Sequence, residues 1–215
     1  NSNTVAGVWD GESLVEHWRL ETHARRTSDE YRVVLRDLFA LSDLAPSTVD
    51  AAILSSVVPP LTPVWNEVCQ RTFGVAPMQV GPGVRTGMPV KTDNPKEVGA
   101  DRIVNSVAAY ERMGGPLVTV DFGTATTFDA VSSDGAYLGG AIAPGVAVSL
   151  DALISRTAKL PRVEVSLPAS VIGKNTVASI QSGVFFGYVG LVDEIVTRMR
   201  EELAQASGDL EPDQV

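Results

Sequence analysis

The sequence contains a single cysteine, Cys69, among its 215 residues, so it cannot form an internal disulfide bond. Such sparing use of cysteine fits a reducing compartment, and the cytoplasm is the expected location. No apolar run approaches the roughly 20 residues that a membrane-spanning helix needs, and the polar residues 1–4 do not resemble a signal peptide. We therefore expect a cytoplasmic protein that has no membrane partner.

Positive charge is also scarce. The 17 Lys and Arg residues are outnumbered by 26 Asp and Glu residues, and the formal net charge is −9. A field of this sign repels nucleic acids and anionic membrane surfaces. The two histidines, His17 and His23, have no cysteine or further histidine at metal-ligand spacing. We expect no nucleic-acid partner, and any anionic ligand must be held by a local site.

The first part of the chain has the pattern of alternating strands and helices. Apolar residues alternate at 5–9 and 14–20 around an Asp-Gly pair, which predicts a β-hairpin. Thr27 and Glu30 have capping-box spacing, which predicts the start of a helix. The further elements expected here are a strand at 51–58, a helix from Leu61 to Gly74, a long loop at 80–101 and a helix at 100–113.

The segment Gly114-Gly115-Pro116 breaks that last helix and predicts a boundary between two parts, residues 1–114 and 115–215. The run 139–145 is too rich in glycine for a regular strand. The elements expected after the break are strands at 117–122 and 126–131, a short strand near 137, a helix at 146–157, and one long helix or two stacked ones at 176–203. This order predicts an α/β fold.

The densest chemical signal is the segment Asp121-Phe122-Gly123-Thr124-Ala125-Thr126-Thr127, where a predicted strand ends in a turn. Glycine lets the backbone approach a phosphate, threonine hydroxyls and N–H groups donate to it, and an aspartate can hold a cation beside it. An isolated Asp-x-Gly-Thr pattern is more often a polar hairpin turn. Residues 1–7, however, have the pattern of the remainder of a second hairpin of the same kind, and two such hairpins would clamp the phosphates of ATP, as in the actin-like ATPase and sugar-kinase superfamily.

Five segments, which lie between residues 82 and 176, resemble the type III pantothenate kinases and occur in the order of that family. They are Pro82-Gly83-Val84-Arg85-Thr86-Gly87, Asp93 to Arg102, Asp121 to Thr127, Gly139-Gly140-Ala141-Ile142 with Pro144-Gly145, and Gly173-Lys174-Asn175-Thr176. The resemblance implies two ribonuclease-H-like halves, residues 1–114 and 115–215, with a cleft between them for ATP and pantothenate. It also implies a homodimer, and a chain that lacks a few residues at its start and a longer piece at its end.

The implied reaction is the ATP-dependent phosphorylation of pantothenate to 4′-phosphopantothenate, the first step of coenzyme A biosynthesis. Mg²⁺ would bind the phosphates, and a monovalent cation, K⁺ or NH₄⁺, would assist. Asp101 would be the catalytic proton acceptor, and Asp121 would bind the monovalent cation. The residues implied to bind pantothenate are Gly99, Ala100, Asp101, Arg102 and Thr176; those implied to bind ATP are Asn1, Ser2, Asn3, Thr4, Val5 and Thr124. Thr92 stands where the family has a tyrosine that approaches the substrate.

Several alternatives remain open at this stage. Asp101 could simply stabilise a helix N-terminus, Arg102 could be a solvated surface charge, and Thr176 could be an ordinary helix start. Cys69 is expected to be a packed thiol rather than a nucleophile, and Gly173-Lys174 does not complete a P-loop. At the level of function, the alternatives are a non-catalytic relative that acts as an accessory or regulatory protein, and a general ATPase of the same superfamily.

Overall fold

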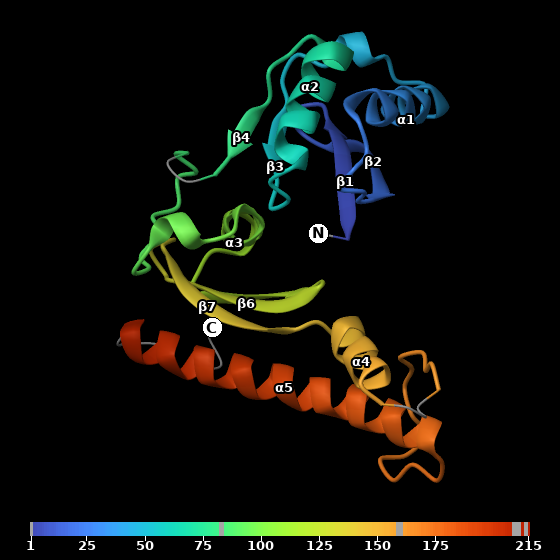
Figure 1. Cartoon of the computed structure of the whole chain (residues 1–215). Helices are drawn as coiled ribbons and strands as arrows, with labels where there is room; N and C mark the ends of the chain where they lie inside the picture. The colour runs from blue at the N-terminus through green and yellow to red at the C-terminus, as the bar shows by residue number, and fades with distance from the viewer. Residues whose placement is uncertain (1, 82–83, 158–160, 208–211, 213–214) are drawn as a thin grey trace. The chain divides into compact units, whose positions relative to one another are not determined.

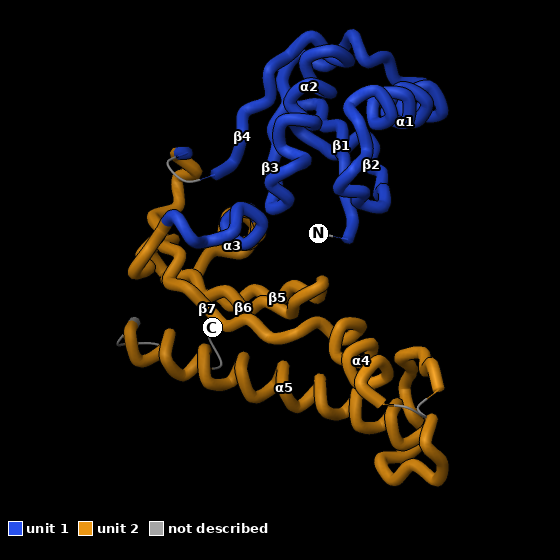
Figure 2. Tube along the Cα trace, viewed as in Figure 1, with its two compact units in different colours: residues 1–84, 96–104 blue, residues 85–95, 105–215 orange. Residues whose placement is uncertain are grey.

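The computed structural model describes residues 2–81, 84–157, 161–207, 212 and 215, and the chain forms two compact units (Figure 2). Unit 1 comprises Asn1–Val84 and Lys96–Val104, and unit 2 comprises Arg85–Pro95 and Asn105–Val215. The chain thus enters unit 2, returns to unit 1 for nine residues, and then stays in unit 2. The boundary expected at Gly114-Gly115-Pro116, between halves 1–114 and 115–215, stays a prediction.

Unit 1 contains two small sheets (Figure 1). The strands β1 (Asn3–Trp9) and β2 (Leu14–Glu21) form the predicted antiparallel hairpin. Its turn is stabilised by Asp10, whose Oδ1 accepts hydrogen bonds from the N–H groups of Glu12 at 3.0 Å and Ser13 at 2.7 Å. The strands β3 (Ile53–Ser55) and β4 (Met78–Val80) pair in parallel. β3 is shorter than the strand expected at 51–58.

Two helices cover the sheets of unit 1 and form its core. The helix α1 (Ser28–Leu41) begins with the predicted capping box between Thr27 and Glu30. The helix α2 (Leu61–Phe73) ends at Gly74, whose φ of 76° is the left-handed conformation that glycine adopts readily. Two short 3₁₀ helices, η1 (Pro46–Thr48) and η2 (Pro95–Glu97), lie in the connections. The core residues are Tyr31, Leu35, Leu61, Trp65 and Val68.

Unit 2 is built on one antiparallel sheet in the order β5 (Leu117–Phe122), β6 (Ala125–Val131), β7 (Tyr137–Pro144). The strand expected near residue 137 is present, but the prediction that residues 139–145 are too glycine-rich for a regular strand is wrong, because β7 runs through residues 139–144. Gly140 pairs with Asp129 on β6, and Gly139 has a φ of +112° beside a register shift at Ala130 and Val131. Glycine at this irregular position allows the ladder to continue.

Helices complete unit 2. The helix α3 (Ala100–Met113) spans the point where the chain returns to unit 2. The helices α4 (Val146–Ser155) and α5 (Thr176–Ser207) both contact β6, and they also contact each other. The interior contains Phe128, Val131, Tyr137 and Leu150. Within the described part of the chain, no helix is both long enough and apolar enough to cross a membrane.

Candidate active site

Gly99 and Asp101 lie at the start of α3, in unit 1, in an arrangement that depends on glycine. A Cβ at Gly99 would lie 2.5 Å from Oδ1 of Asp101, so any other residue would displace the carboxylate. The same Oδ1 accepts a hydrogen bond from the N–H of Arg102 at 2.9 Å, which places the negative charge in the first turn of the helix. The Asp101 side chain is exposed. Asp101 therefore stabilises the start of the helix, and its carboxylate is still accessible to a ligand.

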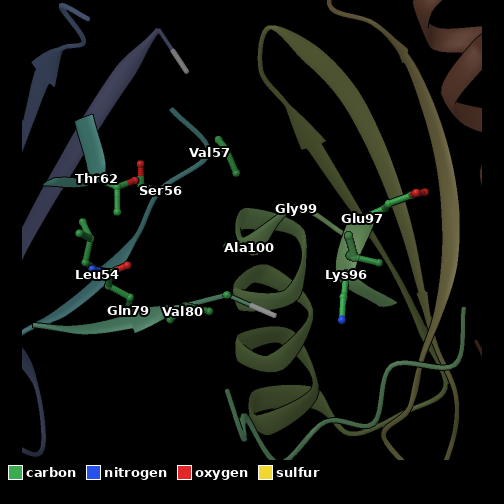
Figure 3. Close-up of a pocket in the computed structure, with 12 residues that line it drawn as sticks. Leu54, Ser56, Val57, Thr62, Gln79, Val80, Lys96, Glu97, Gly99 and Ala100 are labelled. Carbon is green, nitrogen blue, oxygen red and sulfur yellow. The ribbon is translucent and has the colours of Figure 1, made fainter. Parts of the chain in front are cut away.

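A pocket of about 350 Å³ opens beside these residues, within unit 1 (Figure 3). Gly99 and Ala100, two of the residues implied to bind pantothenate, lie on its wall. The other lining residues come from β3, β4, the start of α2 and the segment around η2: Leu54, Ser56, Val57, Thr62, Gln79, Val80, Gly81, Lys96, Glu97 and Val98. Apolar walls with a few polar groups are typical of small-molecule sites.

The predicted phosphate turn lies in unit 2, between β5 and β6. The N–H of Gly123 donates to the carbonyl of Ala125 at 2.9 Å, which closes a tight turn around Thr124. Asp121 is the penultimate residue of β5 and has an exposed side chain, and its Oδ2 accepts a hydrogen bond from Nδ2 of Asn105 at 3.1 Å. Asn105 could not be recognised as a partner of Asp121 from the sequence, because it lies 16 residues away in another element.

The N-terminus of α4 contacts this turn directly. Gly145, the N-cap residue, donates its N–H to the carbonyl of Thr124 at 3.0 Å. A Cβ at Gly145 would lie 2.2 Å from the carbonyl oxygen of Gly123, so only glycine fits there. Among the described residues, no side chain caps α4, and the first N–H groups of a helix favour an anion. The sequence motif contained Gly145, but a glycine before a helix does not by itself reveal this contact.

The surroundings of Asp121 fit one carboxylate ligand of a hard cation. Its Oδ1 accepts no hydrogen bond from the described residues, and carboxylate oxygen is the ligand such cations prefer. Nowhere in the parts of the chain that the structure describes do three or more His, Cys, Asp or Glu side chains gather in a metal-binding cluster. A cation at Asp121 would therefore need other ligands besides a cluster of such side chains.

The residues implied to form the first phosphate loop lie at the start of β1. Asn1 lies outside the described residues. The carbonyl of Ser2 accepts the N–H of Thr22 at 2.9 Å, and the hydroxyls of Thr4 and Thr22 are 2.9 Å apart. Asn3, Thr4 and Val5 are paired with β2. The backbone of this segment is thus held in the hairpin.

Thr176 is the first residue of α5, as the helix-start interpretation predicts. Asn175 caps the helix, because its Oδ1 accepts the N–H of Ala178 at 2.9 Å. The Thr176 side chain is exposed and remains available for a ligand. Thr92 contacts β7, with its Cγ2 lying 3.7 Å from the position of a Cβ on Gly139.

Cys69 agrees with the interpretation of a packed thiol. It is partly buried on α2, and burial raises the pKa of its thiol above the ordinary value. Because the thiolate is the reactive form, a raised pKa makes Cys69 a poor nucleophile at neutral pH.

Comparisons of the sequence with a family model and with related proteins agree on one family. A family model described as type III pantothenate kinase matches residues 1–198. The type III pantothenate kinase of Pelobacter propionicus is 59% identical over 202 residues, which cover 94% of this chain and 80% of that protein. The type III pantothenate kinase of an Anaeromyxobacter species is 56% identical over 99% of this chain and 85% of that protein. The one of Geobacter sulfurreducens is 54% identical over 96% of this chain and 81% of that protein.

A solved structure from Campylobacter jejuni, described as a conserved Baf family transcriptional activator, superposes with a TM-score of 0.50 at 21% identity and covers 84% of this chain and 71% of that one. At this identity the similarity shows a shared fold and nothing about activity. The family match covers most of the chain, and the relatives with the same family name are more than half identical to it. The chain belongs to the type III pantothenate kinase family.

Proposed function

We propose that the chain transfers the γ-phosphoryl group of ATP to pantothenate, giving 4′-phosphopantothenate and ADP, the first step of coenzyme A biosynthesis. The observation that carries this is the family match over residues 1–198. Two features of unit 1 support the proposal. The carboxylate of Asp101 is exposed in the first turn of α3, and the residues just before it, Lys96 to Ala100, line a pocket. The expected setting is the cytoplasm.

Asp101 is the proposed proton acceptor. The hydroxyl oxygen of pantothenate forms a bond to the γ-phosphorus, the bond from that phosphorus to the β–γ bridging oxygen breaks, and ADP leaves with the electron pair. The hydroxyl proton passes to the Asp101 carboxylate. In such reactions the carboxylate chiefly orients the nucleophile, while positioning and charge neutralisation supply most of the rate. Arg102 would bind the pantothenate carboxylate with its guanidinium fork, and Gly99, Ala100 and Thr176 would complete the site.

The phosphates would be held by backbone N–H groups and hydroxyls. Thr124 and the open N-terminus of α4 are the proposed contacts from unit 2, and residues 1–5 are those from unit 1. Mg²⁺ would neutralise charge on the phosphates, with a monovalent cation at Asp121. We also propose the finer architecture: two ribonuclease-H-like halves with the substrates in the cleft between them, and a homodimer.

The second candidate function is a non-catalytic accessory role, and the name of the Campylobacter jejuni structure motivates it. That similarity, at 21% identity, concerns the fold alone. Asp101, Arg102 and the segment from Asp121 to Thr127 are all present in this chain, which favours the kinase.

The test is ADP release with ATP and K⁺, measured with and without pantothenate. We expect release that depends on pantothenate, and Asp101→Asn should lower kcat by about 10²- to 10⁴-fold, the usual contribution of a proton acceptor. Asp37→Asn, which changes an exposed carboxylate on α1, is the matched control and should leave kcat unchanged. ADP release that is independent of pantothenate, or unaffected in Asp101→Asn, would favour the alternative.

A further inference from the structure

The hairpin of β6 and β7 holds the segment that precedes the Asp101 motif. The N–H of Tyr137 donates to the carbonyl of Pro89 at 2.8 Å, and the N–H of Lys91 donates to the carbonyl of Tyr137 at 2.8 Å. Val90 thereby forms a parallel bridge with Tyr137. Lys91 also forms an ion pair with Asp134, with 3.3 Å between Nζ and Oδ2. These bonds attach residues 89–91 to the first residue of β7.

The same hairpin holds the segment that follows the motif. The hydroxyl of Tyr110, in the last turns of α3, donates to the carbonyl of Ser133 at 3.2 Å. Its ring packs on glycine, because a Cβ at Gly135 would lie 2.8 Å from it. Lys91 and Tyr110, which lie on either side of Gly99–Arg102 along the chain, are therefore both bonded to the hairpin of β6 and β7.

A buried pair fixes the residue on which the first attachment depends. The hydroxyl of Tyr137 donates to Oδ1 of Asp129 at 2.7 Å, and the two residues are 0% and 1% exposed. Asp129 lies in the middle of the sheet, between Thr119 on β5 and Gly140 on β7. A carboxylate buried this deeply is tolerated only when it accepts hydrogen bonds. The hydrogen bond consequently holds the Tyr137 ring in one orientation.

We infer that Asp129 and Tyr137 are positioning residues for the phosphoryl transfer proposed above. Neither is assigned to substrate or nucleotide. Their hydrogen bond fixes Tyr137 at the start of β7. The backbone of Tyr137 binds the backbone of residues 89–91, and the chain continues from there to Gly99 and Asp101. A small displacement of a reacting group is costly, since about 1 Å of misplacement can lower a rate 10²-fold. The inference rests on the proposed function.

The decisive variant is Tyr137→Phe, which keeps the ring and removes the hydroxyl. We expect kcat/KM for pantothenate, per folded molecule, to fall about tenfold or more, with little change in KM for ATP. Asp129→Asn retains an oxygen that can accept the Tyr137 proton, so it should keep most of the activity. Amide hydrogen exchange should be faster in Tyr137→Phe at Lys91 and at Tyr137 itself, but unchanged within β5.

Tyr31→Phe is the matched control, because Tyr31 is also 0% exposed and its hydroxyl is also hydrogen-bonded, in the core of unit 1. It should lower the melting temperature without changing KM for pantothenate. The inference is overturned if Tyr31→Phe loses as much kcat/KM for pantothenate as Tyr137→Phe does. It is also overturned if Tyr137→Phe leaves the kinetics, or the amide hydrogen exchange at Lys91, unchanged. A wild-type protein without pantothenate-dependent ADP release would instead overturn the proposed function.

Discussion

Two glycines allow approaches in the candidate site that no other residue permits. Gly99 leaves room for the Asp101 carboxylate, and Gly145 lets the start of α4 contact the turn at Gly123. Gly187 in α5 differs, because a Cβ there would meet nothing within 4 Å. A single added methyl group should therefore disturb the site at Gly99 and at Gly145, but should be tolerated at Gly187.

At Gly99, the substitution Gly99→Ala should displace the Asp101 side chain, because the new Cβ would lie 2.5 Å from Oδ1. We expect kcat/KM for pantothenate to fall about tenfold or more, while the melting temperature changes little since Asp101 is exposed. Gly187→Ala is the control, and it should stabilise the protein by about 0.5–1 kcal/mol without loss of activity. Full activity in Gly99→Ala would mean that Asp101 needs no fixed position.

At Gly145, the substitution Gly145→Ala brings a Cβ to 2.2 Å from the carbonyl oxygen of Gly123, and backbone cannot move aside as a side chain can. The turn that contains Thr124 should shift, so KM for ATP should rise while KM for pantothenate stays near its original value. Steady-state kinetics with each substrate varied would measure this. A rise confined to pantothenate would place the phosphate site elsewhere.

Among the elements, α1 is stabilised by its capping box. The N–H of Thr27 donates to Oε2 of Glu30 at 2.7 Å, and the N–H of Glu30 donates back to the Thr27 hydroxyl. Thr27→Ala should lower the free energy of unfolding by about 1 kcal/mol, measurable by urea denaturation. An unchanged unfolding midpoint would show that the cap contributes nothing in this protein.

The same box predicts how the stability of α1 depends on pH. The backbone N–H of Thr27, followed by its hydroxyl, lowers the pKa of Glu30 below its ordinary value of 4.5. A pKa that is lower in the folded state means that the stabilisation is complete above about pH 4.5 and is lost as the pH falls through the lower folded value. Glu30→Gln, which retains the acceptor but does not titrate, should remove this dependence.

Elements fixed by local chemistry were predictable from the sequence. Thr27 with Glu30 located the start of α1, and Gly74 located the end of α2. The start of β7 near residue 137 was predicted, but its course through residues 139–144 was not, because glycine normally weakens a strand. Here Gly139 and Gly140 are held by pairing with β6, and that partner is not visible in the local pattern.

The contacts that build the site were beyond local patterns for the same reason. The motif identified Asp121 and Thr124, but not that Asn105 donates to the first and Gly145 to the second. The buried bond of Tyr137 with Asp129 depends on the register of two strands. Sequence periodicity indicates which elements form, whereas their register and packing depend on the whole sheet.

For the whole molecule, substrate binding should stabilise the folded state by mass action. Pantothenate at 100 times its Kd would add about 2.7 kcal/mol, which corresponds to a rise of about 5–10 °C in melting temperature for a chain of this size. Thermal denaturation with increasing pantothenate would measure it. β-Alanine is the control ligand, because it shares the carboxylate but lacks the hydroxyl end of the vitamin. No shift with pantothenate, or an equal one with β-alanine, would contradict specific binding.

The order of the units along the chain has a consequence for biosynthesis. Unit 1 is completed by Lys96–Val104, which a ribosome makes only after Arg85–Pro95 of unit 2. A nascent chain that has reached residue 84 therefore still lacks the piece that carries Asp101. Folding of unit 1 can finish only after translation has passed residue 104, and a single cut in the gene cannot yield the two units as separate products.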